Sequence, residues 1–131
     1  KRQVYRKSIK WDTVGEVDSY LPVMETDITL EKGDALAIID TKYYKEPLAV
    51  NYNKEKIRIN NLYQIYAYVQ NIKKDKYKKV VGALLYPLTG EPLNLKYNIV
   101  GYDFYVFSVD LNKPWRDIHD RLLQLGERCL N

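Results

Sequence analysis

The sequence contains very few of the residues that build disulfides and transition-metal sites. Its 131 residues include one cysteine, Cys129, and one histidine, His119. A lone cysteine cannot form an internal disulfide or a cysteine-based zinc site, and its presence favours a reducing, intracellular compartment. A lone histidine argues against histidine-cluster metal sites and against a serine-type triad. Any hydrolytic chemistry must therefore rest on carboxylates and lysines.

Long apolar runs and disorder-promoting residues are also scarce. Apolar runs such as Ala35–Ile39 fall far short of the roughly 20 residues that cross a bilayer, so we expect no membrane segment. With 6 glycines, 5 prolines, 46% hydrophobic and 29% charged residues, the composition is typical of one globular domain over residues 1–131. The sequence begins with Lys1 and shows no secretory signal, so we expect a cytoplasmic chain that is processed or a fragment of a longer protein.

Positive charge is in modest excess and is unevenly placed. The 21 basic residues against 17 acidic ones give a net charge of +4. Basic residues gather in the first ten positions and again over Lys73–Lys79. Clustered cations attract polyanions such as nucleic acid, although a solvated surface explains charge alone equally well. The 13 tyrosines suit base stacking or half-buried packing in strands.

Hydrophobic periodicity predicts an alternation of strands and helices. The predicted strands are Val17–Leu30, Ala35–Tyr44, Val80–Tyr86 and Tyr97–Val109, the last as one strand or a pair. The predicted helices are Arg58–Lys73 and Trp115–Cys129, with apolar stripes of Ile59, Leu62, Ile65, Tyr66 and Val69 in the first and Trp115, Ile118, Leu122 and Leu125 in the second. Residues 1–18 stay unassigned, and residues 45–56 and 73–79 are predicted loops. This order favours an α/β or α+β layered domain.

Two carboxylates and a lysine are expected to meet beside the first hairpin. The turn signal at Glu31–Asp34 folds the chain back and brings Asp27 next to Asp40. Side chains alternate along a strand, so Asp40 and Lys42 point to one face. Two carboxylates at the end of a buried strand are costly unless a divalent cation pairs them. Lys42 can then orient the attacking water and offset charge on phosphorus; a surface ion pair is the alternative interpretation.

A polar pair on the following helix is aimed at the same region. Gln64 and Tyr68 are four residues apart and therefore share a helical face, which differs from part of the apolar stripe. Glu25 shares a strand face with Asp27, so it is either a further metal ligand or an ordinary polar strand residue.

These motifs, in this order, resemble those of the PD-(D/E)XK nuclease superfamily and its RecB-like branch. More closely, four runs are similar to the C-terminal nuclease domain of the McrC family, the cleavage subunits of McrBC-type modification-dependent restriction systems. These runs are Met24–Ile28, Ile39–Tyr43, Asn61–Tyr68 and Leu84–Pro87. The resemblance covers about residues 20–110, and Thr26 stands where the family often has proline.

The resemblance implies an α/β, restriction-endonuclease-like fold with a mixed central sheet flanked by helices. It also implies Mg²⁺-dependent hydrolysis of DNA phosphodiesters, with Mn²⁺ as a substitute. The implied catalytic residues are Asp27, Asp40, Lys42, Gln64 and Tyr68, and the implied metal ligands are Asp27 and Asp40. We expect the backbone carbonyl of Thr41 to complete the protein ligands. The implied partners are DNA and a McrB-like GTPase, the latter bound through an N-terminal region outside this sequence.

Two other classes of function remain open from the sequence. The chain could be a nuclease-like module that binds DNA or protein without cutting, or a structural subunit that docks through tyrosines. An inactive module does not need all of Asp27, Asp40 and Lys42, so their joint presence favours the endonuclease. Metal-dependent nicking of plasmid DNA separates the first function from the other two.

Overall fold

The chain folds into one central sheet with a helix on each face and two small accessory ribbons. The computed structural model describes residues 2–15, 20–43, 48–51, 54–72 and 74–131. Its strands are β1 (Arg2–Tyr5), β2 (Ser8–Ile9), β3 (Met24–Glu25), β4 (Ile28–Lys32), β5 (Ala35–Thr41), β6 (Leu48–Asn51), β7 (Lys54–Ile57), β8 (Lys79–Pro87), β9 (Asn94–Ile99) and β10 (Tyr102–Val109). Its helices are α1 (Ile59–Asn71), α2 (Trp115–Leu130) and the 3₁₀ turn η1 (Lys74–Lys76).

The sheet is mixed, with six strands in the order β1-β4-β5-β8-β10-β9. The three central strands β5, β8 and β10 run parallel, whereas β1, β4 and β9 pair antiparallel with their neighbours. Helix α1 connects β5 to the parallel strand β8, as a parallel pair requires a crossover connection. The predicted α/β class and the mixed sheet flanked by helices are confirmed.

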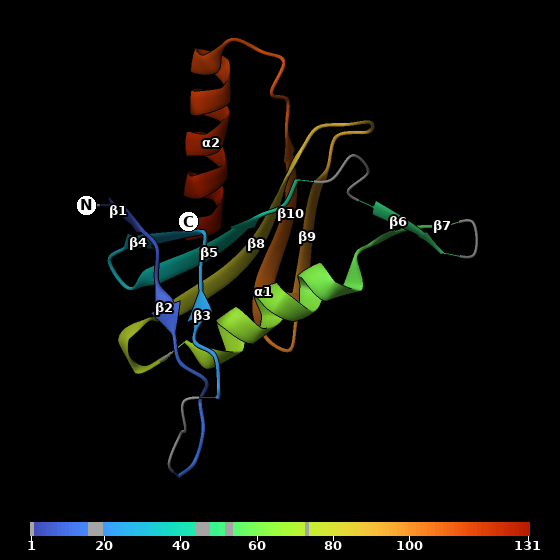
Figure 1. Cartoon of the computed structure of the whole chain (residues 1–131). Coiled ribbons are helices and arrows are strands. Elements are labelled where there is room, and N and C mark those ends of the chain that lie inside the picture. Colours follow the sequence, from blue (N-terminus) through green and yellow to red (C-terminus); the bar gives the residue numbers. More distant parts are fainter. Residues whose placement is uncertain (1, 16–19, 44–47, 52–53, 73) are drawn as a thin grey trace.

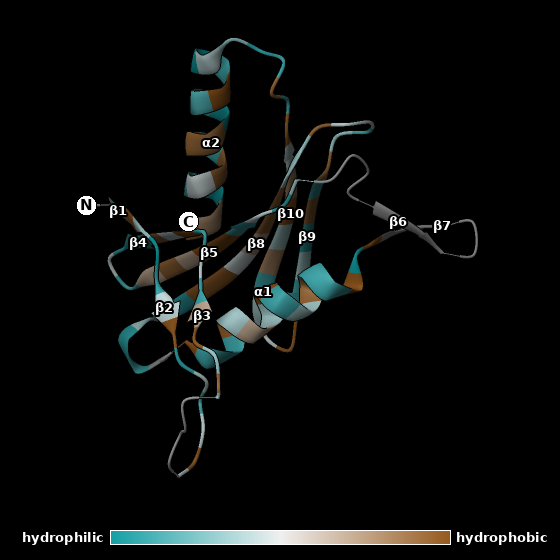
Figure 2. Ribbon diagram, viewed as in Figure 1, coloured by the Kyte–Doolittle hydropathy of each residue, from teal (hydrophilic) through white to brown (hydrophobic). Residues whose placement is uncertain are grey.

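The two helices cover opposite faces of the sheet (Figure 1). Alternation along β5 supplies both cores, because Leu36 and Ile38 pack on the α1 side and Ala37 and Ile39 on the α2 side. Figure 2 shows the apolar residues concentrated along these central strands, where both faces are covered. No helix in the described part of the chain is long and apolar enough to cross a membrane.

Helix α1 packs on β8 at a position where residue 82 is glycine. A Cβ atom at Gly82 would lie 2.8 Å from the Phe104 ring and 2.9 Å from Cγ1 of Ile65. These distances are too short for real contacts, so only glycine lets Ile65 of α1 rest directly on the sheet. The glycine thereby allows α1 to pack directly on the strands.

Most predicted elements are confirmed, but the first predicted strand is wrong. The described part of Val17–Leu30 contains two short strands, β3 and β4, with a break at Thr26 and Asp27. The break arises because β3 pairs with β2 while β4 pairs with β1 and β5. The unassigned N-terminal residues supply β1 and β2, and the predicted loop over residues 45–56 contains the β6–β7 hairpin.

The apolar stripe predicted for the last helix is wrong at its beginning. Trp115 is 70% exposed, and Leu122 is also exposed, whereas Leu125 and Cys129 are buried. Figure 1 shows why: α2 lies against the sheet near its C-terminal end, and its first turns stand clear of the strands. In α1, Ile59 is likewise exposed, while Ile65 and Val69 are buried as predicted.

Candidate active site

The candidate site lies at the end of β5, on the face that α1 covers. Alternation puts Leu36, Ile38 and Asp40 on one side of the strand, so Asp40 continues the row of side chains that faces α1. Asp40 is only 2% exposed. Lys42 follows two residues later on the same face, as predicted, and its Nζ lies 3.0 Å from Oδ2 of Asp40.

The hairpin brings the second carboxylate to the same place. Strands β4 and β5 are joined at Gly33, whose φ of 61° suits a tight turn, and the last recorded pair of the ladder is Ile28 with Ile39. The next position along each strand is Asp27 and Asp40. Asp27 Oδ2 accepts hydrogen bonds from both N and Oγ1 of Thr41, each 3.0 Å long. Asp27 and Asp40 are also close enough for each to shift the pKa of the other, so the structure brings the two carboxylates together, as the sequence predicts.

Lys42 is held from the helix as well as from the sheet. Its backbone N–H donates to the carbonyl of Leu85 in β8 at 2.9 Å, which extends the ladder beyond Thr41. Its Nζ donates to Oε1 of Gln64 at 2.5 Å. The ammonium group is thus fixed between an anionic oxygen of Asp40 and a neutral amide oxygen of Gln64.

A hydrogen-bonded chain determines which way the Gln64 amide points. Tyr68 OH donates to the backbone carbonyl of Glu25 at 3.2 Å, so it is free to accept the bond from Nε2 of Gln64 at 2.8 Å. With Nε2 engaged by Tyr68, the amide oxygen of Gln64 faces Lys42. The structure brings together all five predicted catalytic residues, and the two on α1 reach the site through Lys42.

The two carboxylates have different electrostatic surroundings. Burial raises the pKa of Asp40 above its ordinary value and the charge of Asp27 adds to this, while Lys42 opposes the rise. Burial also raises the pKa of Asp27, but the hydrogen bonds from Thr41 and the charge of Lys42 outweigh it, so that pKa lies below its ordinary value. Asp27 is therefore stable as an anion, whereas the ionised form of Asp40 needs additional positive charge nearby to be stable.

The donor set fits a hard divalent cation. Among the described residues, no aligned hydrogen bond reaches Oδ2 of Asp40, although Lys42 lies beside it. No cluster of three or more His, Cys, Asp or Glu occurs in the described ranges either. Mg²⁺ commonly uses one or two carboxylates and completes its shell with water and phosphate oxygens. Asp27, Asp40 and the carbonyl of Thr41 are the groups that would hold it.

The sequence did not predict the contacts that Arg6, Asn61 and Tyr86 make beside the site. Arg6 extends from the N-terminal segment, where its Nε donates to the carbonyl of Thr26 at 3.3 Å and its NH2 lies 3.6 Å from the Glu25 carboxylate. Asn61 of α1 donates to Tyr86 OH of β8 at 2.7 Å. No sequence pattern signals the second contact, because the burial of Asn61 is visible only in the structure. Glu25 is paired with Arg6, which favours the polar strand residue over a further metal ligand.

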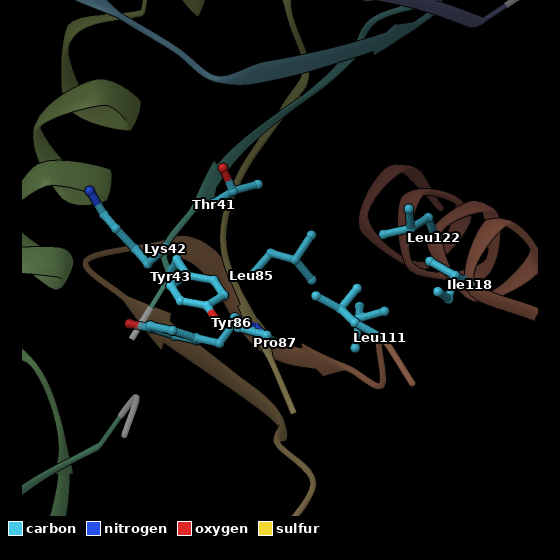
Figure 3. A pocket seen from close by; sticks show the side chains of 10 residues that line it. Thr41, Lys42, Tyr43, Leu85, Tyr86, Pro87, Leu111, Ile118 and Leu122 are labelled. Carbon is cyan, nitrogen blue, oxygen red and sulfur yellow. The ribbon is translucent and has the colours of Figure 1, made fainter. Parts of the chain in front are cut away.

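An apolar cavity of about 370 Å³ opens on the other side of Thr41 and Lys42 (Figure 3). In this view the Lys42 amine points away from the apolar side chains toward α1, while Ile118 and Leu122 approach from α2. The cavity walls include Leu85, Pro87 and Leu111. It adjoins the site and shares Thr41 and Lys42 with it, but neither Asp27 nor Asp40 lines it.

The cationic segment 73–79 lies at the opposite end of the sheet. The backbone N–H groups of Lys78 and Lys79 donate to the carbonyl of Asp34 at the start of β5, which is roughly 20 Å from its end for seven residues. Lys76 pairs with Glu31 at 3.6 Å and Lys78 with Asp34 at 3.8 Å. These lysines are partly neutralised and far from Asp40, and Lys73 lies outside the described residues. The structure therefore does not favour this loop as the DNA contact beside the site.

Comparison with known proteins assigns the chain to a family. The family model described as McrBC 5-methylcytosine restriction system component matches residues 8–87, the part of the chain that holds all the residues of the site. The chain belongs to this family, and its predicted McrC-like character is confirmed. It is 34% identical over 128 residues to the type IV methyl-directed restriction enzyme EcoKMcrBC of Escherichia coli K12. That alignment covers 95% of this chain and 37% of the relative.

Proposed function

We propose that residues 1–131 form a nuclease domain of the PD-(D/E)XK type that hydrolyses DNA phosphodiester bonds with Mg²⁺ in a cytoplasmic, McrBC-like restriction system. The observation that carries the proposal is the meeting of Asp27, Asp40 and Lys42 at the end of β5. The surrounding topology, an antiparallel hairpin followed by a helix crossover to a parallel strand, supports it. We extend the proposal to two partners, methylated DNA and a McrB-like GTPase.

Each residue has a defined task in this proposal. Asp27 and Asp40 hold the cation, and the hydrogen bonds from Thr41 keep Asp27 ionised and oriented. A bound divalent cation supplies Lewis-acid stabilisation of the charge that develops on the phosphate. Lys42 contributes a fixed positive charge close to the same phosphate, since it is restrained by Asp40 and Gln64 before DNA arrives.

Preorganisation is the reason to place the catalytic charge on Lys42. A long lysine side chain ordinarily loses much conformational freedom when it binds a ligand. Here its ammonium already donates to Gln64 Oε1 and lies 3.0 Å from Oδ2 of Asp40, so little reorganisation is needed as the transition state forms. Tyr68 contributes indirectly, by orienting the Gln64 amide.

The proposal is tested by plasmid cleavage with the full-length polypeptide, its GTPase partner, methylated DNA and Mg²⁺. We expect Lys42→Ala to slow cleavage by about 100-fold or more while leaving DNA affinity nearly unchanged, because it removes a contact made mainly in the transition state. Lys78→Ala, an exposed lysine at the other end of the sheet, is the matched control and should cut normally. Salt-sensitive DNA binding without wild-type cleavage would instead support a binding module.

A further inference from the structure

Helix α1 is fastened to the rest of the fold by polar contacts on both sides of Gln64. Toward the C-terminal end, Tyr68 OH donates to the carbonyl of Glu25 at 3.2 Å. Toward the N-terminal end, Nδ2 of Asn61 donates to Tyr86 OH at 2.7 Å. Asn61 precedes Gln64 by three residues and Tyr68 follows it by four, so all three lie along one side of the helix.

The contact between Asn61 and Tyr86 is deeply buried. Asn61 is 3% exposed and Tyr86 is 1% exposed. A buried polar pair contributes little net stability compared with an apolar pair of the same shape, because both groups lose their hydration. Such a pair instead restricts the orientation of α1, because the bond forms only at one rotation and one height of the helix.

Within the described residues, the start of α1 lacks a side-chain cap and an acidic first turn. Its N-cap residue, Arg58, makes no side-chain capping bond, and its first turn contains no acidic residue. Such helix ends fray, because their first N–H groups have no partner within the helix. Asn61 is in this turn, one turn before the residue that contacts Lys42.

We infer that Asn61 and Tyr86 form a positioning pair, which sets the rotation and height of α1 so that Gln64 Oε1 meets Lys42. This inference rests on the proposed nuclease function. Tyr86 lies on β8 immediately after Leu85, whose carbonyl holds the backbone of Lys42. Strand β8 therefore holds the backbone of Lys42 through Leu85, and through Tyr86 it holds the helix that restrains the Lys42 ammonium group.

The test uses Asn61→Leu, Tyr86→Phe and the double variant in the full-length polypeptide with its GTPase partner and Mg²⁺. We expect single-turnover DNA cleavage to slow by about 10- to 100-fold, the range for residues that support a catalytic group, with a much smaller change in DNA affinity. Tyr86→Phe removes only one oxygen atom and is the variant to use if Asn61→Leu fails to fold. The double variant removes both ends of this bond together, so its melting temperature should fall by less than the sum of the two single-variant losses while cleavage stays slow.

A double-mutant cycle with Gln64→Ala distinguishes positioning from general structural support. If Asn61 acts through Gln64, Asn61→Leu slows the wild type but has little further effect on Gln64→Ala. A merely structural role predicts that Asn61→Leu slows cleavage by the same factor in the wild type and in Gln64→Ala. Tyr5→Phe is the control, since it deletes a hydroxyl that donates to Glu31 at 2.6 Å and should not slow cleavage.

The outcomes separate this inference from the proposal beneath it. Wild-type rates in both Asn61→Leu and Tyr86→Phe, or fully additive losses in the cycle, would overturn the positioning role while leaving the nuclease function in place. A wild-type assembly that binds methylated DNA but does not cut it would overturn the proposed function, and this inference with it.

Discussion

Asp27 and Thr41 are joined through a single carboxylate oxygen, because Oδ2 of Asp27 accepts both the backbone N–H and the side-chain hydroxyl of Thr41 at 3.0 Å. This double contact extends the hairpin by one step beyond the last ladder pair. It also fixes the orientation of a carboxylate that stands between two elements of different pairing, β3 and β4. Thr41, which lies between Asp40 and Lys42 in sequence, thus also orients the carboxylate of Asp27.

The first prediction follows from that contact. Thr41→Val keeps the shape and the backbone N–H but deletes the hydroxyl that donates to Asp27. We expect Mg²⁺ affinity to weaken by about tenfold, as is typical when a partner that orients a metal ligand is lost. Calorimetric titration of Mg²⁺ measures it. Thr41→Ser retains the hydroxyl and should bind like the wild type; equal affinity in Thr41→Val would exclude an orienting role for this bond.

The second prediction concerns the buried carboxylate of Asp40. Burial raises its pKa, which means that the ionised form is destabilised in the folded protein without a cation. We expect Asp40→Asn to melt at or above the wild-type temperature in EDTA, and to lose cleavage. Mg²⁺ should raise the melting temperature of the wild type, since it binds the folded state, and leave that of Asp40→Asn unchanged. An equal Mg²⁺ effect on both proteins would place the cation elsewhere.

The third prediction concerns acid stability far from the site. The hydrogen bond from Tyr5 lowers the pKa of Glu31 below its ordinary value of 4.5, and Lys76 adds to this against the opposing effect of burial. A lowered folded-state pKa stabilises the fold above the unfolded value, and this contribution is lost as the pH falls through the folded pKa. Glu31→Gln should therefore melt below the wild type at neutral pH, with the gap closing in acid. The exposed Glu91→Gln is the control, and a gap that widens in acid would contradict the assignment.

The sequence was sufficient to predict the hairpin geometry of the site. The turn at Gly33 and the alternation of β5 rest on local rules, so they placed Asp27, Asp40 and Lys42 together correctly. The helical spacing of Gln64 and Tyr68 likewise predicted a shared face. The roles of these residues in catalysis stay predictions.

Contacts between segments distant in sequence could not be predicted in the same way. The break between β3 and β4 depends on pairing with β1 and β2, which have no strong pattern of their own. The exposure of Trp115 depends on where α2 leaves the sheet rather than on its apolar spacing. The bond between Asn61 and Tyr86 requires knowledge of how α1 crosses β8, which no local rule supplies.

The last prediction concerns the turn between β9 and β10, where Val100 and Gly101 have φ values of 52° and 84°. Ile99 pairs with Tyr102, so this is a two-residue hairpin with both central residues in the left-handed region. That conformation suits Gly101 but strains Val100, whose branched side chain is exposed and gains little packing in return. Asparagine tolerates this region, so Val100→Asn should stabilise the protein by about 1 kcal/mol. Urea unfolding measures the gain, and the same change at the exposed Val14, whose φ is not positive, should produce none. A Val100→Asn protein no more stable than the wild type would show that the strain is relieved elsewhere in the hairpin.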